Sequence, residues 1–233
     1  MKLDLAAVEE TAKHLYIQAL KILPPDIKDG FKRLDATETD PTAKSILATM
    51  IKNIDVAEDT TNLLCQDTGI PIYNVLIGRG VEVDGHALKE AIRKGCERAT
   101  VEHPLRSSVV HPITRVNEQT SCGIKVPVIT IDFSDRDEFF EMEMIPKGSG
   151  SENGSFLKMC IPAEGVAGIK TFVVDKVMEV GGRVCPPTIV GVGVGGTSDL
   201  CTKLAKKAGA RPLGSVCDDP EGAKLEKELS AAV

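Results

Sequence analysis

The sequence predicts a mixed α/β (α+β) fold in a single domain, with mixed sheets flanked by amphipathic helices. Apolar residues recur at helical spacing in several segments, and other segments are β-rich runs bounded by glycine. The two kinds of segment follow each other without an internal repeat or a linker over 233 residues. This pattern indicates one domain that contains both helices and sheets.

The helical segments are identified by their spacing and by the residues that end them. The first runs to about Leu23, where the sequence PPD stops it. The segment 42–64 carries apolar residues at helical spacing, and so does 85–100, which contains Cys96. A helix over 164–182 ends at its glycine pair, and further helices are predicted after 196 and over 220–233.

The predicted strands are shorter and rich in β-branched residues. The first spans 70–78. Two more, over 125–133 and 138–146, are joined by the charged segment SDRDE and predict a β-hairpin. A fourth lies within 188–196, after Cys185, and the polar segment 147–155 is predicted to be a loop.

The last predicted helix has an apolar stripe, with Leu225 and Leu229 one turn apart, yet no capping residue precedes the end at Val233. A frayed terminal helix is one interpretation. A chain cut short is the other, and the pattern alone leaves both open.

Charge and composition exclude several classes of protein. The net charge is −6 and the basic residues are scattered, which gives no support for binding nucleic acid or an anionic membrane. No apolar run is long enough for a membrane span, and the first residues form an acidic and basic amphipathic helix rather than a signal peptide. We therefore expect a cytoplasmic protein.

The seven cysteines are widely spaced, and in the cytoplasm they remain reduced. Cys65 is followed directly by Gln66, Asp67 and Thr68, which suits a metal ligand with hydrogen-bonded surroundings, although a buried cysteine at a strand entry is equally compatible. Cys185 precedes two prolines that make the entry to the next segment rigid. No C-x-x-C pair occurs, so a zinc knuckle is not expected, and we assign Cys96, Cys160 and Cys201 to the core.

A glycine loop offers a competing interpretation. Gly191, Gly193 and Gly196 match G-x-G-x-x-G between a predicted strand and a helix that Ser198 would cap, and Asp218 and Asp219 follow. This would be a nucleotide-binding oxidoreductase domain. The segment RPLGSVCDD is a poor second strand, so the signal is weak.

Two further segments are dense in polar groups. The segment 103–123 contains His103, Arg106, His111, Arg115 and Asn117, and arginine is well shaped to bind a carboxylate with two bonds. The segment 147–155 can form a polar cradle. Each is equally compatible with an ordinary solvated loop.

Taken in order, LCQDTG, HPITRVN, KGSGSEN and CPPTIVGVGVGGT resemble the class I fumarase and L(+)-tartrate dehydratase family of iron–sulfur hydro-lyases. The resemblance is to the α subunit, or the N-terminal catalytic domain of fused forms, and it covers residues 1–233. It implies a [4Fe–4S] cluster held by three cysteines, of which Cys65 and Cys185 match two. The third ligand, and a histidine implicated in proton transfer, are expected beyond Val233 in a C-terminal stretch that this sequence lacks.

The resemblance also assigns roles to individual residues. Gln66 and Asp67 are expected to face the substrate, with Asp67 assisting a proton transfer, and Arg106 matches the arginine that binds a substrate carboxylate. Gly123 is expected to offer backbone near the substrate, while Cys122 stands where many relatives carry threonine.

The implied reaction is the reversible dehydration of a hydroxy-dicarboxylate, malate to fumarate or tartrate to oxaloacetate. The implied partner is a β subunit, in an assembly of α2β2 type. A non-catalytic assembly subunit is a third hypothesis. The enzyme hypothesis further predicts that Cys65 and Cys185 converge, with Asp67 and Arg106 facing the same cavity, and that this chain by itself folds without an intact cluster.

Overall fold

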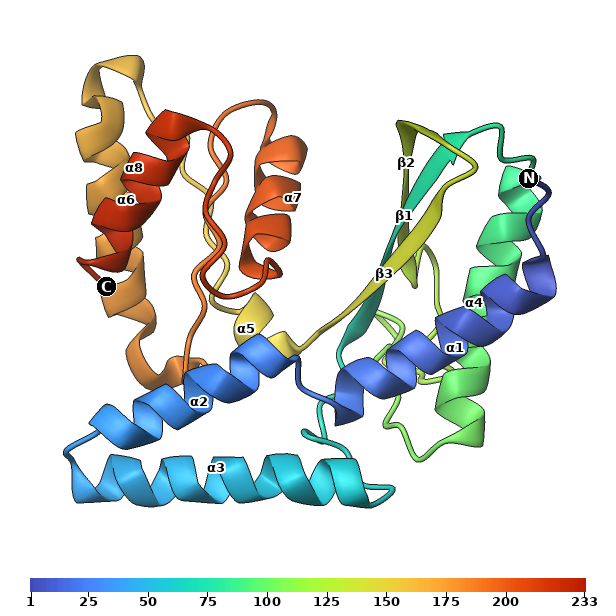
Figure 1. The fold of residues 1–233 in the computed structure, drawn as a ribbon, viewed down its shortest axis with the longest axis horizontal. Helices are drawn as coiled ribbons and strands as arrows, with labels where there is room; N and C mark the ends of the chain where they lie inside the picture. Colours follow the sequence, from blue (N-terminus) through green and yellow to red (C-terminus); the bar gives the residue numbers. More distant parts are fainter. The chain divides into compact units, whose positions relative to one another are not determined.

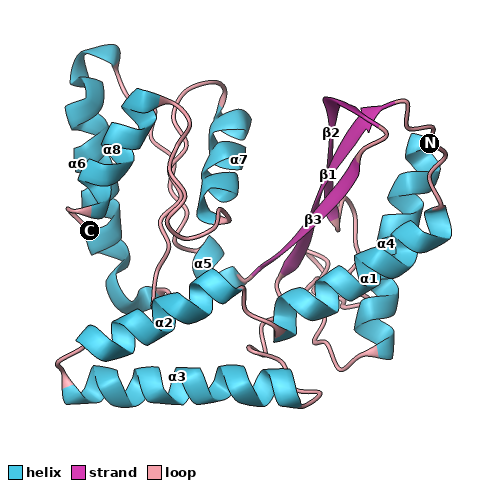
Figure 2. Cartoon of the chain, viewed as in Figure 1, coloured by secondary structure: helices cyan, strands magenta, loops and turns pink.

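The computed structural model describes residues 1–233 and confirms the mixed α/β class (Figure 1). Two compact units are present, Met1–Ser149 and Gly150–Val233. All three strands belong to the first unit, as the magenta arrows in Figure 2 show. None of the helices combines the length and the apolar character that crossing a membrane requires.

The sheet of the first unit is built around its most apolar strand. β1 (Ile70–Arg79) lies between β2 (Val128–Asp137), with which it is parallel, and β3 (Phe140–Lys147), with which it is antiparallel. The predicted hairpin between the second and third strands is therefore wrong, because each of them pairs with β1 instead. A central strand satisfies its backbone groups on both sides, and β1, buried at alternate positions, is the strand best suited to that place.

A short crossing at the end of β1 makes this arrangement possible. The chain leaves β2, passes the end of β1 and returns as β3, with the Gly78 amide donating to the Phe139 carbonyl at 2.7 Å. A side chain at Gly78 would collide with the Arg136 carbonyl and the Phe139 Cβ. The charged residues 134–137, predicted to be a loop, belong to β2.

The core lies between one face of the sheet and two helices, α1 (Leu5–Lys21) and α4 (Gly85–Glu102), which lie together beside the strands in Figure 1. The two helices approach closely at Gly95, where a Cβ would collide with the Glu9 carbonyl and lie 2.8 Å from the Ala12 Cβ. The core side chains that are essentially inaccessible to solvent are Ala12, Tyr16, Tyr73, Leu88, Ile92, Cys96 and Ala99.

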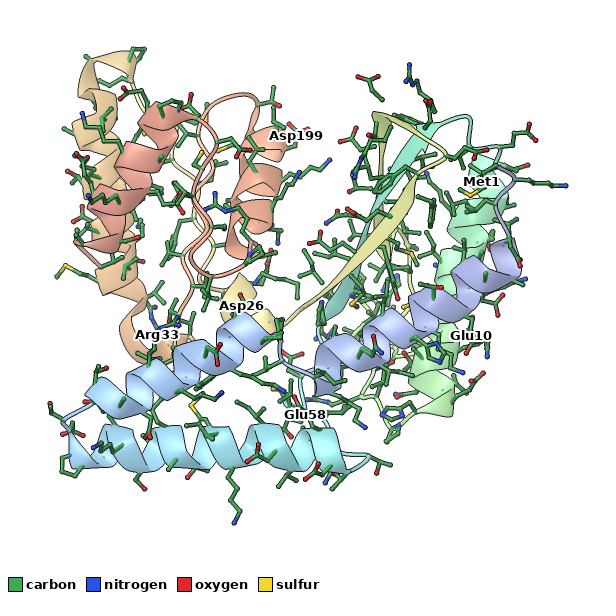
Figure 3. The ribbon with its side chains drawn as sticks, in the orientation of Figure 1. Met1, Glu10, Asp26, Arg33, Glu58 and Asp199 are labelled. Carbon is green, nitrogen blue, oxygen red and sulfur yellow. The ribbon has the colours of Figure 1, made fainter.

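An ion-pair network borders this contact on the outside. Arg98 on α4 reaches Glu9 at 3.0 Å and Glu10 at 2.9 Å on α1, and Glu102 on its own helix at 2.7 Å. Figure 3 labels Glu10. These groups are solvated, so the burial beneath them contributes more to holding the two helices together than the ion pairs do.

The sequence did not predict α2 (Pro25–Thr37). The PPD segment does end α1, but Pro25 then occupies the first turn of the next helix, where its missing amide costs nothing. α2 packs against α3 (Pro41–Asp59), and Phe31 of α2 and Ile54 of α3 are both buried. Lys28 forms an ion pair with Glu58, which Figure 3 labels. The predicted helix over 42–64 is α3, which ends before the TTNLL segment.

The second unit consists of helices and irregular segments. α6 (Gly165–Val180) ends at Gly181 as predicted, and α8 (Pro220–Ser230) contacts it through an ion pair between Lys170 and Glu228. Single turns occur at η1 (Pro162–Glu164), η2 (Gly181–Arg183) and α5 (Ser149–Glu152), the last inside the predicted loop 147–155 and beginning at the end of the first unit.

The strand predicted within 188–196 is absent, because this segment pairs with no other strand. It runs against α7 (Ser198–Gly209) instead. A Cβ on Gly191 would collide with the Ala205 carbonyl, and one on Gly193 with the Cys201 carbonyl. The glycines thus allow the chain to lie directly against a helix.

We predict that Gly95→Ala destabilises the protein by about 1–3 kcal/mol, because the added methyl group meets the α1 backbone rather than a flexible side chain. Gly85→Ala is the matched control in the same helix, since nothing lies within 4 Å of its Cβ position. Urea unfolding measures both variants. Equal stability of the two would show that α1 and α4 are not in close contact at Gly95.

Candidate functional site

A pocket of about 490 Å³ lies in the first unit, near the start of β1. Ile70 at the start of β1 pairs with Lys147 at the end of β3, so the segment 65–69 and Ser149 come to the same end of the sheet. The residues 106–119, which follow α4, complete the wall. The lining residues are Cys65, Gln66, Asp67, Arg106, Ser107, Ser108, Val110, Arg115, Asn117, Gln119 and Ser149.

Asp67 connects the three segments that form this pocket. Its Oδ2 accepts hydrogen bonds from the amide and the hydroxyl of Ser149, both at 2.9 Å. Its Oδ1 accepts from the Gly69 amide at 3.1 Å and from the Ser108 hydroxyl at 3.3 Å. Partial burial opposes ionisation, but these hydrogen bonds outweigh it and hold the pKa of Asp67 below its ordinary value of 3.8. Asp67 is therefore a fixed anion at neutral pH.

Cys65 is exposed at this pocket, and its sulfur accepts a hydrogen bond from the Asp67 amide at 3.4 Å. Cys65 is thus an accessible thiol rather than a buried structural cysteine, and its role as a cluster ligand stays a prediction.

Arg106 and Gln66 line this pocket and also a neighbouring one of about 410 Å³. The side chain of Arg106 is exposed and forms no ion pair, whereas its carbonyl accepts a hydrogen bond from the Thr68 hydroxyl. The Thr68 hydroxyl thus holds the Arg106 backbone in place, and the Arg106 guanidinium is available to a ligand.

A layer of buried hydroxyl groups supports the pocket. The Tyr16 hydroxyl on α1 donates to the Thr68 carbonyl at 3.1 Å, and burial raises the pKa of Tyr16 to about 12, so it stays protonated. The Ser107 hydroxyl accepts from the Ser121 amide at 3.0 Å, and the Asn117 amide group donates to the Ser107 carbonyl at 2.9 Å. Sequence reasoning missed Ser107 and Ser108, because nothing in the local pattern shows that Ser107 faces Ser121 or that Ser108 faces Asp67.

Gly123 is not among the residues that line the pocket. Its carbonyl accepts a hydrogen bond from Arg93 at 3.0 Å, and its role beside the substrate stays a prediction. Cys122 is buried against Cys96. The hydrogen bond that Cys96 shares with Cys122, together with burial, raises the pKa of Cys96, and the same hydrogen bond lowers the pKa of Cys122, so Cys96 is a protonated part of the core.

Cys185 lies in the second unit, exposed, after η2 and before a cis Pro186–Pro187 peptide. Its convergence with Cys65 stays a prediction. Of the cysteines assigned to the core, Cys96 is buried and Cys201 is partly buried, but Cys160 is exposed, because the irregular segment before η1 leaves it uncovered. No group of three or more histidine, cysteine or acidic side chains is arranged to hold a metal ion.

The other residues of the proposed nucleotide site have structural roles. Gly191 and Gly193 contact α7, as described above. Asp219 caps α8 through the Gly222 amide at 2.7 Å, and the N-cap position of α7 is held by Thr197, not by Ser198 as predicted. Gly191, Gly193 and Asp219 thus have structural roles that do not require a bound nucleotide.

We predict that Asp67→Asn lowers stability by about 1–2 kcal/mol at neutral pH, because an amide cannot accept all the hydrogen bonds that the carboxylate accepts. The folded pKa lies below 3.8, so this contribution is present above that pH and is lost as the pH falls through the folded pKa. Unfolding free energies across the acid range measure it, with the exposed Asp55→Asn as control. A difference that does not change with pH would contradict the assigned role.

We predict that Tyr16→Phe costs about 1–3 kcal/mol, since it removes a buried donor from the Thr68 carbonyl. It should also speed labelling of the Cys65 thiol by loosening the segment beneath it. Tyr73→Phe is the matched control, because its hydroxyl donates at 2.9 Å to Ala12, a carbonyl inside α1 that already accepts a helical bond. Equal rates of Cys65 labelling in the two variants would show that the Tyr16 hydroxyl does not hold the pocket wall in place.

Comparison with known proteins agrees with the motifs. Residues 9–233 match the family described as fumarate hydratase (Fumerase). The chain is 42% identical over 225 residues to the putative L(+)-tartrate dehydratase subunit alpha of Methanocaldococcus jannaschii, a match that covers 95% of this chain and 79% of that protein. It is 33% identical over 207 residues to the L(+)-tartrate dehydratase subunit alpha of Escherichia coli strain K12, which covers 89% and 68% of the two chains. The resemblance is thus confirmed, and the chain belongs to the fumarate hydratase (Fumerase) family.

Proposed function

We propose that this chain is the α subunit of a hydro-lyase that reversibly dehydrates a hydroxy-dicarboxylate, either malate or tartrate. One observation carries the proposal: a single pocket gathers Cys65, Gln66, Asp67 and Arg106. To these four residues of the first unit the motifs assign ligand, catalytic and substrate-binding roles, whereas Gly123, also expected near the substrate, does not line the pocket. Membership of the fumarate hydratase family supports the same class of reaction.

The proposed cofactor is a [4Fe–4S] cluster, with Cys65 and Cys185 as two of its ligands. Both thiols are exposed, and Cys65 already receives an amide donor at its sulfur, so the donor chemistry fits. When bound, such a cluster supplies a Lewis-acidic iron that polarises the hydroxyl and a carboxylate of the substrate.

The pocket residues would bind and orient the substrate. Arg106 presents a guanidinium without an internal partner, which can hold one carboxylate through two bonds. Gln66, exposed at the same wall, can donate to the substrate and accept from it. Four donors already engage Asp67 and lower its pKa, so the geometry favours an orienting anion, and its part in proton transfer stays a prediction.

The proposed partner is a β subunit, in a cytoplasmic assembly of α2β2 type. The relatives from Methanocaldococcus jannaschii and Escherichia coli are both named as alpha subunits, which supports a heteromeric enzyme. The β subunit would supply further carboxylate-binding groups and part of the proton-transfer machinery.

Anaerobic reconstitution of the α subunit, including the stretch in which the third cysteine ligand is expected, with iron, sulfide and the β subunit tests the proposal. We expect a brown protein that hydrates fumarate or dehydrates tartrate. Cys65→Ser should lose both the colour and the turnover, because one cluster ligand is gone. Cys160→Ser is the matched control, an exposed cysteine that no motif assigns to the cluster. A colourless protein without turnover of either substrate would overturn the proposal.

A further inference from the structure

The pocket contains a second arginine to which no motif assigned a role. Arg115 lines the same wall as Arg106, and its guanidinium forms no ion pair or hydrogen bond within the chain. Asp67 is the only carboxylate that lines the pocket, and it is engaged by serine and glycine donors rather than by either arginine. The pocket is therefore lined by two guanidinium groups without an internal partner and by one carboxylate whose oxygens already accept hydrogen bonds.

The backbone at Arg115 is held in a conformation that arginine rarely adopts. Its φ is 62°, in the left-handed region. A tight turn imposes this conformation: the Arg115 amide donates to the His111 carbonyl at 2.9 Å, and the His111 amide donates to the Val116 carbonyl at 2.8 Å. The His111 Nδ1 closes the turn by accepting from the Thr114 amide at 3.1 Å.

Strain of this kind persists only where the surrounding structure imposes it, and it gathers at ligand-binding sites. Gln119, which lines the same pocket, also has a left-handed backbone, with φ 61°. The turn from His111 to Val116 thus directs a long cationic side chain toward a pocket that lacks a matching anion.

We propose that Arg115 binds the second carboxylate of the substrate, opposite the carboxylate held by Arg106, and thereby selects dicarboxylates over monocarboxylates. The identity of the substrate rests on the proposed function, whereas the selection of a dianion rests on the pocket. Neither guanidinium is paired with Asp67, so two forks are available to a ligand, and each can bind one carboxylate through two bonds.

Calorimetric titration of the assembled complex with succinate and with butyrate tests this. The two probes share a four-carbon chain and differ by one carboxylate, and neither undergoes dehydration. Arg115→Asn removes the guanidinium while keeping a residue that tolerates left-handed backbone. We expect the preference for succinate over butyrate to fall by about tenfold or more, as the loss of a charged hydrogen-bonding pair implies.

Two further variants sharpen the test. Arg115→Lys keeps the charge without the fork and should retain an intermediate preference. Arg79→Gln removes an exposed arginine at the far end of β1, paired with Asp137 at 3.3 Å, and should leave the preference unchanged.

The outcomes separate this inference from the proposed function. If the complex lacks hydratase activity but Arg115→Asn still removes its preference for succinate, the role of Arg115 is supported and the proposed function is refuted. An unchanged preference in Arg115→Asn, or an equal loss of affinity for both probes, would overturn the role of Arg115 even in an active enzyme.

Discussion

The pocket depends on a buried hydrogen bond from the Tyr16 hydroxyl to the Thr68 carbonyl. Tyr16 is fully buried on α1, and its hydroxyl reaches the segment that carries Cys65 and Asp67. The Thr68 hydroxyl then binds the Arg106 carbonyl, so one core side chain fixes both walls. A buried polar group without its partner is costly, which makes this layer a strong constraint on the loops above it.

Sheet topology supplies the other constraint. Because β1 is parallel to β2 and antiparallel to β3, the start of β1 and the end of β3 lie at one edge. Asp67 and Ser149 are far apart in sequence, yet they meet there at 2.9 Å. A side chain at Gly69 would collide with the backbone of Pro146 and Lys147, so the same edge also requires a glycine. A hairpin between β2 and β3, as the sequence predicted, would have removed β1 from its central place and separated these segments.

The sequence predicted those features that depend on local pattern. β1, α3, α4 and α6 follow from periodicity, and four residues that the motifs singled out line one pocket: Cys65, Gln66, Asp67 and Arg106. It failed where tertiary contacts decide. Pro25 was interpreted only as a helix stop, and the segment 188–196 suggested a strand that is absent. Gly191 and Gly193 of this segment pack closely on α7, a role that no local signal distinguishes from phosphate binding. The donors around Asp67 come from three separate segments, so its pKa could not be inferred from the sequence.

The electrostatics of the pocket suggest a division of labour in the reaction. Efficient proton transfer at neutral pH needs a group whose pKa lies near 7. Asp67 has a pKa held below 3.8, far from that range, and two arginines line the pocket with it. These groups are suited to binding and aligning a dianion, and the part of Asp67 in proton transfer stays a prediction. A substrate aligned by two guanidinium groups on this chain would present its reacting carbon to a base supplied by another part of the enzyme. That arrangement agrees with relatives that are named as one subunit of a larger enzyme. The hydrogen bonds to Asp67 would then serve to keep the substrate aligned. If the Asp67 carboxylate became protonated, its hydrogen bonds to Ser149 would weaken, and this part of the pocket wall would be less firmly held.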